Sequence, residues 1–431
     1  MSEEIITTME KKTLANNRYY VLALLTLVYT FNHIDRQILT ILLEPIRMEF
    51  NLSDTALGVL TGIAFALFYA TLGIPVALWA DRGNRRNILA LSLTIWSGMT
   101  ALSGMASNFT HLLLARIGVG IGEAGGTPPA TSIIADLFPP EKRATALGVY
   151  TTGISFGILA GFLIGGFIYE AYGWRMAFFV AGIPGLFLAA IVRFTLNEPV
   201  RGLSEQREAT EKAPGMRDIL SFLKKQKSAQ HLLFGGALIC IVANGWLAMI
   251  APYLIRNFDI SVKEAGISLA ILIGVFGGLG AIIFGHICDR LSQQSLAWRP
   301  RMIMLATAIS LPFQVAFLFS DNIWIAYAFY AVPSLLGLLY ASLAYTAMQE
   351  LFPLRMRAFA AALMLFCLTL VGIGGGPVIV GALSDMFKDS YGDASLKYGL
   401  LIVLGFSLWS LFHLRLAERD YMTDVEKAKK Y

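Results

Sequence analysis

The sequence DLFPPEKRA at residues 136–144 recurs as ELFPLRMRA at residues 350–358, an offset of 214 residues, which is about half of the 431-residue chain. The dipeptide Asp-Arg at 81–82 likewise recurs at 289–290, an offset of 208 residues. Each copy of these motifs follows an apolar stretch. Two motifs that recur at such similar offsets predict two parallel copies of one structural unit.

The composition places the chain in a membrane. Hydrophobic residues make up 56% of the sequence and charged residues 15%, with a mean hydropathy of +0.63, whereas soluble domains have about 25% charged residues. A bilayer core of about 30 Å requires roughly 20 apolar residues in a helix. We predict spans at residues 19–43, 55–80, 87–106, 111–137, 144–169 and 176–196 in the first half, and at 231–255, 265–288, 302–319, 323–351, 358–383 and 398–416 in the second.

The predicted fold is therefore an all-α membrane protein with twelve transmembrane helices in two six-helix bundles. The bundles are predicted at 19–197 and 231–416, between an N-terminal segment at 1–18 and a tail at 417–431. The linker at 198–230 contains an amphipathic stretch at 216–227, which predicts a short interfacial helix.

The basic residues predict the orientation of these spans. Of the 34 Lys and Arg residues, 26 lie in or next to the termini and loops of one side, and six lie in the loops of the other side. Because basic residues are retained on the cytoplasmic side, both termini are expected in the cytoplasm. The first span has no cleavage site after it and is expected to be retained. The same distribution predicts membrane topology rather than a surface for nucleic acid.

Several local patterns indicate neither a cofactor nor catalysis. The three cysteines share no metal-ligand spacing, and the chain has no phosphate-binding loop of the Walker type. GxGxxG at 120–125 and GxSxG at 153–157 lie inside apolar spans without a preceding strand, so we expect no enzyme. Gly153, Gly157, Gly161 and Gly165 instead predict a face for close helix packing.

Four charged residues lie well inside the predicted first and fourth spans, away from the span ends: Asp35, Arg36, Arg116 and Glu123. Charges inside a bilayer persist mainly where they are paired or line water. Their depths predict two pairs, Asp35 with Arg116 and Arg36 with Glu123. The corresponding positions of the second half hold Tyr330 and Gly337, so the charges belong to one repeat.

This asymmetry favours a functional role over structural ion pairing alone, which stays the alternative. A buried carboxylate that faces an arginine can exchange a proton when its pairing changes. Asp35 and Glu123 are therefore the predicted proton-coupling residues.

A second charged cluster lies at the predicted cytoplasmic ends. Acidic and basic residues that recur there in both halves predict an inner gate held by ion pairs, whereas membrane anchoring alone explains only the arginines. The predicted gate residues are Asp81, Arg82, Arg85, Arg143, Asp289, Arg290 and Arg357.

Together with the twelve spans, three motifs carry a resemblance to a known family. They are FNHIDRQ at 31–37, ARIGVGIGEA at 115–124 and DLFP at 136–139. The chain resembles the major facilitator superfamily, and within it the spinster branch, as a bacterial member. The resemblance implies a secondary transporter that works by alternating access, with proton linkage and with lipid-like cargo such as sphingosine-1-phosphate or lysophospholipids.

The expected substrate is a small amphipathic, anionic solute. Arg36 and Arg116 would bind its phosphate or carboxylate, and its apolar part would contact Phe31, Trp246, Met249 and Tyr340. The alternative is efflux of unrelated hydrophobic compounds. The repeat argues against a pore. The absence of a nucleophile paired with a base argues against a membrane enzyme that modifies lipids. The other expected partners are protons and membrane lipid. The protein is expected to be a monomer in the bacterial inner membrane.

Overall fold

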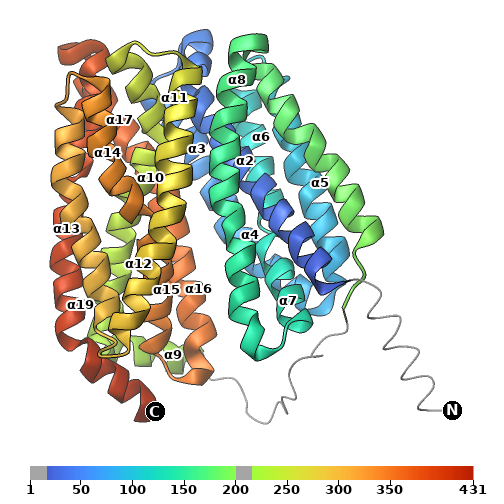
Figure 1. The fold of residues 1–431 in the computed structure, drawn as a ribbon, viewed down its shortest axis with the longest axis vertical. Helices are drawn as coiled ribbons and strands as arrows, with labels where there is room; N and C mark the ends of the chain where they lie inside the picture. Colours follow the sequence, from blue (N-terminus) through green and yellow to red (C-terminus); the bar gives the residue numbers. More distant parts are fainter. Residues whose placement is uncertain (1–16, 200–215, 431) are drawn as a thin grey trace. The chain divides into compact units, whose positions relative to one another are not determined.

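The computed structural model describes residues 17–199 and 216–430, which form helices with no strand among them. Most of the predicted N-terminal segment and the middle of the predicted linker lie outside these residues. Figure 1 shows the helices in chain order. Those of the first half are α2 (Arg18–Phe50), α3 (Asp54–Thr61), α4 (Ile63–Arg82), α5 (Arg85–Ser103), α6 (Phe109–Glu123), α7 (Thr127–Leu137) and α8 (Pro140–Thr195).

The second half repeats this order after a short additional helix. Its elements are α9 (Met216–Lys225), α10 (Lys227–Phe258), α11 (Val262–Leu269), η1 (Ala270–Phe276), α12 (Gly277–Ser292), α13 (Trp298–Leu318), α14 (Ile323–Gly337), α15 (Leu339–Glu350), η2 (Leu354–Met356), α16 (Arg357–Cys367), η3 (Leu368–Ile373), α17 (Gly374–Tyr391), η4 (Gly392–Ala394), α18 (Ser395–Val403) and α19 (Gly405–Lys430). Both copies of the repeated motif lie at a junction between two helices, α7 to α8 and α15 to α16.

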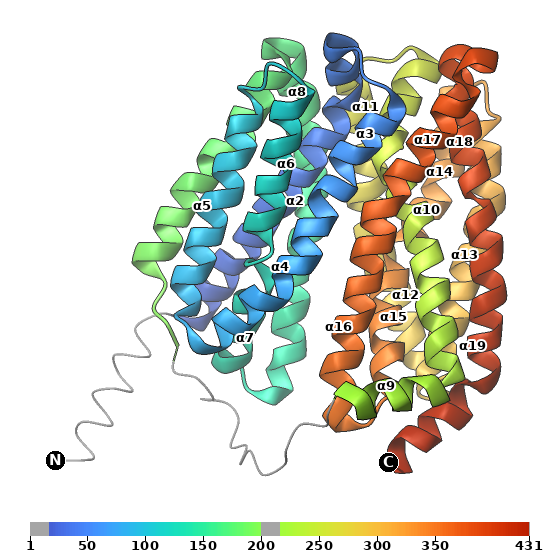
Figure 2. The same ribbon diagram turned by 180° about the vertical axis from the view of Figure 1, so that it is seen from behind.

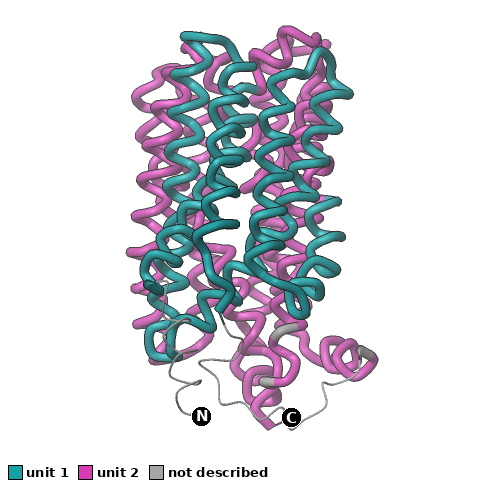
Figure 3. The backbone as a smooth tube through the Cα atoms, turned by 90° about the vertical axis from the view of Figure 1, so that its right-hand side faces the viewer, with its two compact units in different colours: residues 1–42, 67–210 teal, residues 43–66, 211–431 magenta. Residues whose placement is uncertain are grey.

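The chain divides into two compact units, which are drawn in different colours in Figure 3. Unit 1 comprises Met1–Leu42 and Leu67–Thr210, and unit 2 comprises Leu43–Ala66 and Glu211–Tyr431. The end of α2, all of α3 and the first turn of α4 therefore belong to unit 2, although they come from the first half of the sequence.

Seven helical stretches among the described residues are long and apolar enough to cross a membrane. One of them, α8, has 56 residues, which would make a straight helix of about 84 Å, almost three bilayer cores. It contains a break at Gly173, where φ is 80°, a backbone conformation that glycine adopts without steric cost. The break separates the predicted fifth and sixth spans.

The predicted continuous span at 111–137 is interrupted after Glu123, and this corrects the sequence analysis. α6 ends at Glu123 and α7 begins at Thr127 with two prolines in its first turn. Proline lacks an N–H to continue the preceding helix but is well suited to start a new one. The second half has a break at Gly337, which lies 214 residues after Glu123.

The predicted glycine face of α8 is confirmed. Gly153, Gly157, Gly161 and Gly165 all lie against α2, close enough that an added Cβ would contact α2 atoms. At Gly157 this Cβ would lie 2.6 Å from the carbonyl oxygen of Thr30. Small residues at this spacing let two helix backbones approach closely.

The predicted amphipathic helix in the linker forms as α9, which lies at one end of unit 2 near α16 and the last turns of α19 (Figure 2). Its apolar residues Ile219 and Phe222 are buried in the core of unit 2, where the Phe222 and Phe352 rings are 5.5 Å apart. The helix therefore packs its apolar face on protein.

We expect Gly157→Ala to destabilise the protein by about 1–3 kcal/mol, the usual cost of overpacking a tight contact. The added methyl group must displace the α2 backbone at Thr30. Gly148→Ala in the same helix is the control, because a Cβ there meets no atom within 4 Å. The measurement is the melting temperature of the two purified variants in detergent. Equal melting temperatures would show that the glycine face does not set this packing.

Candidate functional site

The predicted pair between Arg36 and Glu123 is present in unit 1. The Nη2 and Nε atoms of Arg36 lie 2.5 Å and 2.8 Å from Oε2 of Glu123. The Glu123 side chain is fully buried, whereas that of Arg36 is 22% exposed. The Arg36 guanidinium also lies 5.3 Å from the centre of the Tyr69 ring, a cation–π contact. The pair thus has one fully buried acidic partner and one partly exposed basic partner.

The predicted contact between Asp35 and Arg116 is not formed, which corrects the second predicted pair. Asp35 is fully buried, and among the described residues neither of its carboxylate oxygens has a hydrogen bond of normal geometry. The charge of Arg116 still acts on Asp35, as do the charges of Glu123 and Arg36. Depth along the helices placed these residues near one another, but it did not determine the direction of each side chain.

Arg85, a predicted gate residue, is buried at the start of α5. Its Nε donates to Glu198 Oε1 at 2.7 Å and its Nη1 to Ser132 at 2.8 Å, and Nη1 also pairs with Asp136. Burial opposes its charge, but the hydrogen bonds to Glu198 and Asp136 hold the pKa of Arg85 above its ordinary value. Arg85 therefore joins the start of α5, the end of α7 and the chain that follows α8.

An equivalent ion pair occurs in unit 2. Arg299 Nε lies 2.7 Å from Glu350 Oε1, and these two residues are each 214 positions after Arg85 and Asp136. Sequence reasoning missed this pair although the same offset connects it to the repeated motif. It named Asp289 as a gate residue instead, and the 72% exposed Asp289 side chain is 3.8 Å from Arg299.

The other predicted gate residues make weaker or external contacts. Arg143 donates to the carbonyl oxygen of Ala135 at 3.1 Å, and Arg357 to that of Phe352 at 3.4 Å. Three further predicted gate residues are exposed: Asp81, Arg82 and Arg290. These contacts lie within one unit or the other, so the predicted gate role stays a prediction.

A cavity of about 220 Å³ lies within unit 2. Its wall is aromatic and aliphatic, with neutral polar groups and no charged side chain. Residues of its wall include Ile239, Asn244, Trp246, Ser310, Gln314, Tyr330, Gly337 and Tyr340. Such a composition suits an apolar ligand held by a few hydrogen bonds.

The predicted apolar contacts differ in position. Trp246 and Tyr340 line the cavity, and the ring of Trp246 is stacked on that of Tyr330 at 6.1 Å. The hydroxyl group of Tyr340 donates to the Cys240 sulfur at 3.2 Å. Met249 is fully buried and is not among the lining residues, and Phe31 is half-buried in unit 1.

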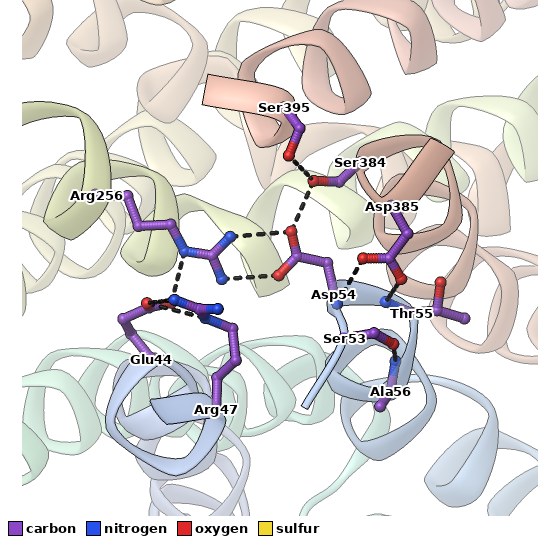
Figure 4. Close-up of polar contacts among 10 residues, drawn as sticks. All are labelled: Glu44, Arg47, Ser53, Asp54, Thr55, Ala56, Arg256, Ser384, Asp385 and Ser395. Carbon is purple, nitrogen blue, oxygen red and sulfur yellow. Dashed lines mark hydrogen bonds and ion pairs between the residues drawn. The ribbon is translucent and has the colours of Figure 1, made fainter. Parts of the chain in front are cut away.

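Sequence reasoning also missed a buried ion network in unit 2, at the end of α10 remote from α9 (Figure 4). Arg256 binds both oxygens of Asp54 at 2.7 and 2.9 Å and donates to Glu44 at 2.7 Å. Arg47 donates to the other oxygen of Glu44 at 2.6 Å. The side chains of Glu44, Asp54 and Arg256 are each 7% exposed or less.

The same network fixes the start of α3. The two carboxylate oxygens of Asp385 accept the backbone N–H groups of Asp54 and Thr55, at 3.0 and 2.8 Å. Ser384 donates to Asp54 at 2.6 Å. An acidic side chain at a helix N-terminus satisfies its free N–H groups and its dipole. The network therefore attaches residues 43–66 to α10 and α17.

No cluster of three or more metal-ligating side chains occurs in residues 17–199 and 216–430. Cys240, Cys288 and Cys367 are free thiols. The arrangement instead provides buried charges in one unit and an uncharged cavity in the other.

Comparison with known proteins identifies relatives over nearly the whole chain. The sequence signature of the Major Facilitator Superfamily matches residues 25–377. An MFS-type efflux pump of Mycolicibacterium smegmatis is 33% identical over 93% of this chain and 92% of its own length. The sphingosine-1-phosphate transporter SPNS2 of Danio rerio is 28% identical over 93% of this chain and 84% of its own length.

A solved structure agrees with the fold. The crystal structure of a bacterial homologue of the human lysosomal transporter spinster, in an inward-facing and unoccupied conformation, has a TM-score of 0.85 and 31% identity. The match covers 94% of this chain and 98% of that one. It confirms the predicted fold of twelve membrane helices in two bundles.

We expect Arg256→Met to destabilise the protein by about 3–5 kcal/mol, because it leaves the buried carboxylates of Glu44 and Asp54 without their counter-charge. Arg419→Met is the control, since Arg419 pairs with Asp420 at 3.3 Å on the surface, where an ion pair contributes about 0–1 kcal/mol. The melting temperatures of both variants in detergent measure the difference. If Arg256→Met lowers the melting temperature no more than the control does, the network does not stabilise the protein.

Proposed function

Because the chain belongs to the Major Facilitator Superfamily and, within it, to the spinster branch, we propose that it moves a small amphipathic, anionic, lipid-like solute across the membrane by alternating access, coupled to protons. The chain is an integral, multi-pass membrane protein, and its relatives are transporters. A lysophospholipid or sphingosine-1-phosphate is the proposed type of solute.

One observation carries this proposal: positions related by the repeat have opposite chemistry. Arg116 and Glu123 of unit 1 are buried charged residues. Their counterparts 214 residues later, Tyr330 and Gly337, both line the uncharged cavity of unit 2. An amphipathic molecule needs these two environments, a cationic group for its head and an apolar space for its chain.

The exposure of Arg36 supports a mechanism for coupling. An anionic head that binds the Arg36 guanidinium competes with Glu123 for the same donors. Glu123 would then be a buried carboxylate without its counter-charge, a situation that favours its protonated form. Binding of solute and binding of a proton therefore assist each other, so the proton gradient can drive solute movement. Asp35, which is buried in the field of the same charges, is the second proposed proton carrier.

Efflux of unrelated hydrophobic compounds is the second candidate function. The relative in Mycolicibacterium smegmatis is described as an efflux pump, and the neutral wall of the unit 2 cavity does not require an anionic solute. Transport of a hydrophobic cation at a rate that does not depend on Arg36 would favour this second function. For either function we propose a monomer in the bacterial inner membrane, with both termini in the cytoplasm.

We expect Glu123→Gln to abolish proton-driven transport, because the amide keeps the shape but cannot exchange a proton. The assay is uptake of radiolabelled lysophosphatidate into proteoliposomes with an imposed pH gradient. Glu170→Gln, at an exposed position of the same unit, is the control. Gradient-driven uptake by Glu123→Gln at the control rate would contradict the role of Glu123.

We expect Gly337→Leu to shorten the longest acyl chain that the protein accepts. Gly337 lines the cavity, and a Cβ there meets no atom within 4 Å, so the new side chain fits and occupies the space of the solute. Gly285→Leu, which also has open space but lies outside the cavity wall, is the control. Competition by lysophosphatidates of increasing chain length measures the effect. An unchanged chain-length profile would show that this cavity does not bind the acyl chain of the solute.

A further inference from the structure

The cavity of unit 2 is bordered by a chain of hydrogen bonds that begins at Asn244 and ends at Leu368. The side-chain amide of Asn244 donates to the carbonyl oxygen and to the sulfur of Cys240, at 3.0 and 3.2 Å. The hydroxyl group of Tyr340 donates to the same sulfur at 3.2 Å, and the thiol donates to the carbonyl oxygen of Leu368, also at 3.2 Å. Asn244 and Tyr340 line the cavity, whereas Cys240 is not among the lining residues and is 2% exposed.

Two backbone carbonyl groups fix the direction of the hydrogens in this chain. A carbonyl oxygen only accepts, so the Cys240 sulfur must give its single hydrogen to Leu368. The sulfur therefore accepts from Tyr340, whose hydroxyl hydrogen is used. In the same way, the atom of the Asn244 amide that faces the carbonyl oxygen of Cys240 must be its nitrogen. Both N–H groups of Asn244 are thus used inside the protein, and its amide oxygen is the group left for the cavity.

Two further hydroxyl groups of the wall also use their hydrogen within the protein. Thr307 donates to the carbonyl oxygen four residues earlier at 2.9 Å, and Ser334 does the same at 2.8 Å. The polar groups of fixed direction in the wall therefore present lone pairs to the cavity. The remaining polar side chains of the wall are Ser310, Gln314 and Ser407. Serine and glutamine can present either a donor or an acceptor.

A hydroxyl group is the ligand group that this arrangement suits best. An ester carbonyl or an ether oxygen only accepts, so it would face the lone pairs of Asn244 and Tyr340. An ammonium group donates, but the described residues that line the cavity include no acidic side chain to balance its charge, and burying an unpaired charge is costly. A hydroxyl group donates to Asn244 without adding charge, and its own lone pairs can accept from a serine or glutamine of the wall.

We propose that the cavity of unit 2 binds a hydroxyl group of the solute, which donates its hydrogen to the amide oxygen of Asn244. The solute is then a lipid-like molecule with a hydroxyl group on the part that enters the cavity. Asn244 selects this group, and Cys240 is a positioning residue because it holds the amide in one orientation. The inference rests on the proposed function, which assigns the apolar part of the solute to this cavity.

Binding of a bromo-octanol to the purified protein in detergent tests the site. Bromine quenches the fluorescence of a nearby tryptophan, and Trp246 belongs to the wall of the cavity. The methyl ether of the same compound accepts hydrogen bonds but cannot donate one. We expect the protein to bind the alcohol about tenfold more tightly than the ether, the factor that one hydrogen bond represents. Equal binding of the two compounds, or saturable quenching that persists in Trp246→Phe, would overturn the proposal.

Four variants test whether Asn244 causes the preference for the alcohol. Asn244→Leu should lose the tenfold preference. Cys240→Ala should lose most of it, because the amide is no longer held, and Cys240→Ser should restore it, because serine also donates and accepts. Thr307→Val is the control and should keep the preference, since the hydroxyl group that it removes is bonded to its own helix. A full preference in Asn244→Leu would overturn the role of this residue.

A parallel transport assay separates the hydroxyl site from the proposed function. It measures uptake of lysophosphatidate into proteoliposomes with an imposed pH gradient. A tenfold preference for the alcohol without such uptake would support the hydroxyl site and reject the proposed function. Uptake by a protein that shows no preference would support the proposed function and overturn the hydroxyl site.

Discussion

A charge that is removed from water must keep its counter-charge or a network of hydrogen bonds, and this constraint governs the arrangement of the chain. Arg36 with Glu123, Arg85 with Asp136, and Arg256 with Glu44 and Asp54 are all at least partly buried ion pairs. Each arginine has an acid from a distant part of the sequence. These pairs connect helices from distant parts of the sequence, and removing one partner of any pair leaves an uncompensated charge in an apolar environment.

Some of the ion pairs occur in both copies of the repeat, and one occurs in a single copy. Arg85 with Asp136 and Arg299 with Glu350 are related by the same offset of 214 residues, so both copies use them. They join corresponding helix ends in the two units, as expected of an interaction that maintains the fold. Arg36 with Glu123 occurs in one copy, and the other copy has a cavity at the corresponding position. The proposed function therefore rests on the difference between two otherwise similar units.

The sequence predicted the helices well because hydropathy and periodicity are local properties. The spans, the repeat, the fold and the glycine face of α8 all depend on residues close together in the chain or on a constant offset. The pair between Arg36 and Glu123 was also predictable, since depth in the bilayer follows from position in each span. The contact of Asp35 with Arg116 was not, because depth does not give side-chain direction.

Interactions that bring distant segments together leave no such pattern. Nothing near Glu44 or Asp54 indicates that their partner is Arg256, 212 and 202 residues later. The interruption after Glu123 was missed for a different reason: residues 111–137 were treated as one apolar span, although its glycines and prolines end one helix and start another. Arg299 carried a usable signal, the offset of 214 from Arg85, which was not followed.

The membership of residues 43–66 in unit 2 has a consequence for biogenesis. During synthesis, Glu44 and Asp54 leave the ribosome about 200 residues before Arg256 is made. The insertion machinery must therefore accommodate two acids at the end of the first hairpin whose shared partner, Arg256, does not yet exist. Unit 2 is complete only when its last helices are added to a segment that was inserted first, so a fragment that starts after the linker lacks a part of its own core.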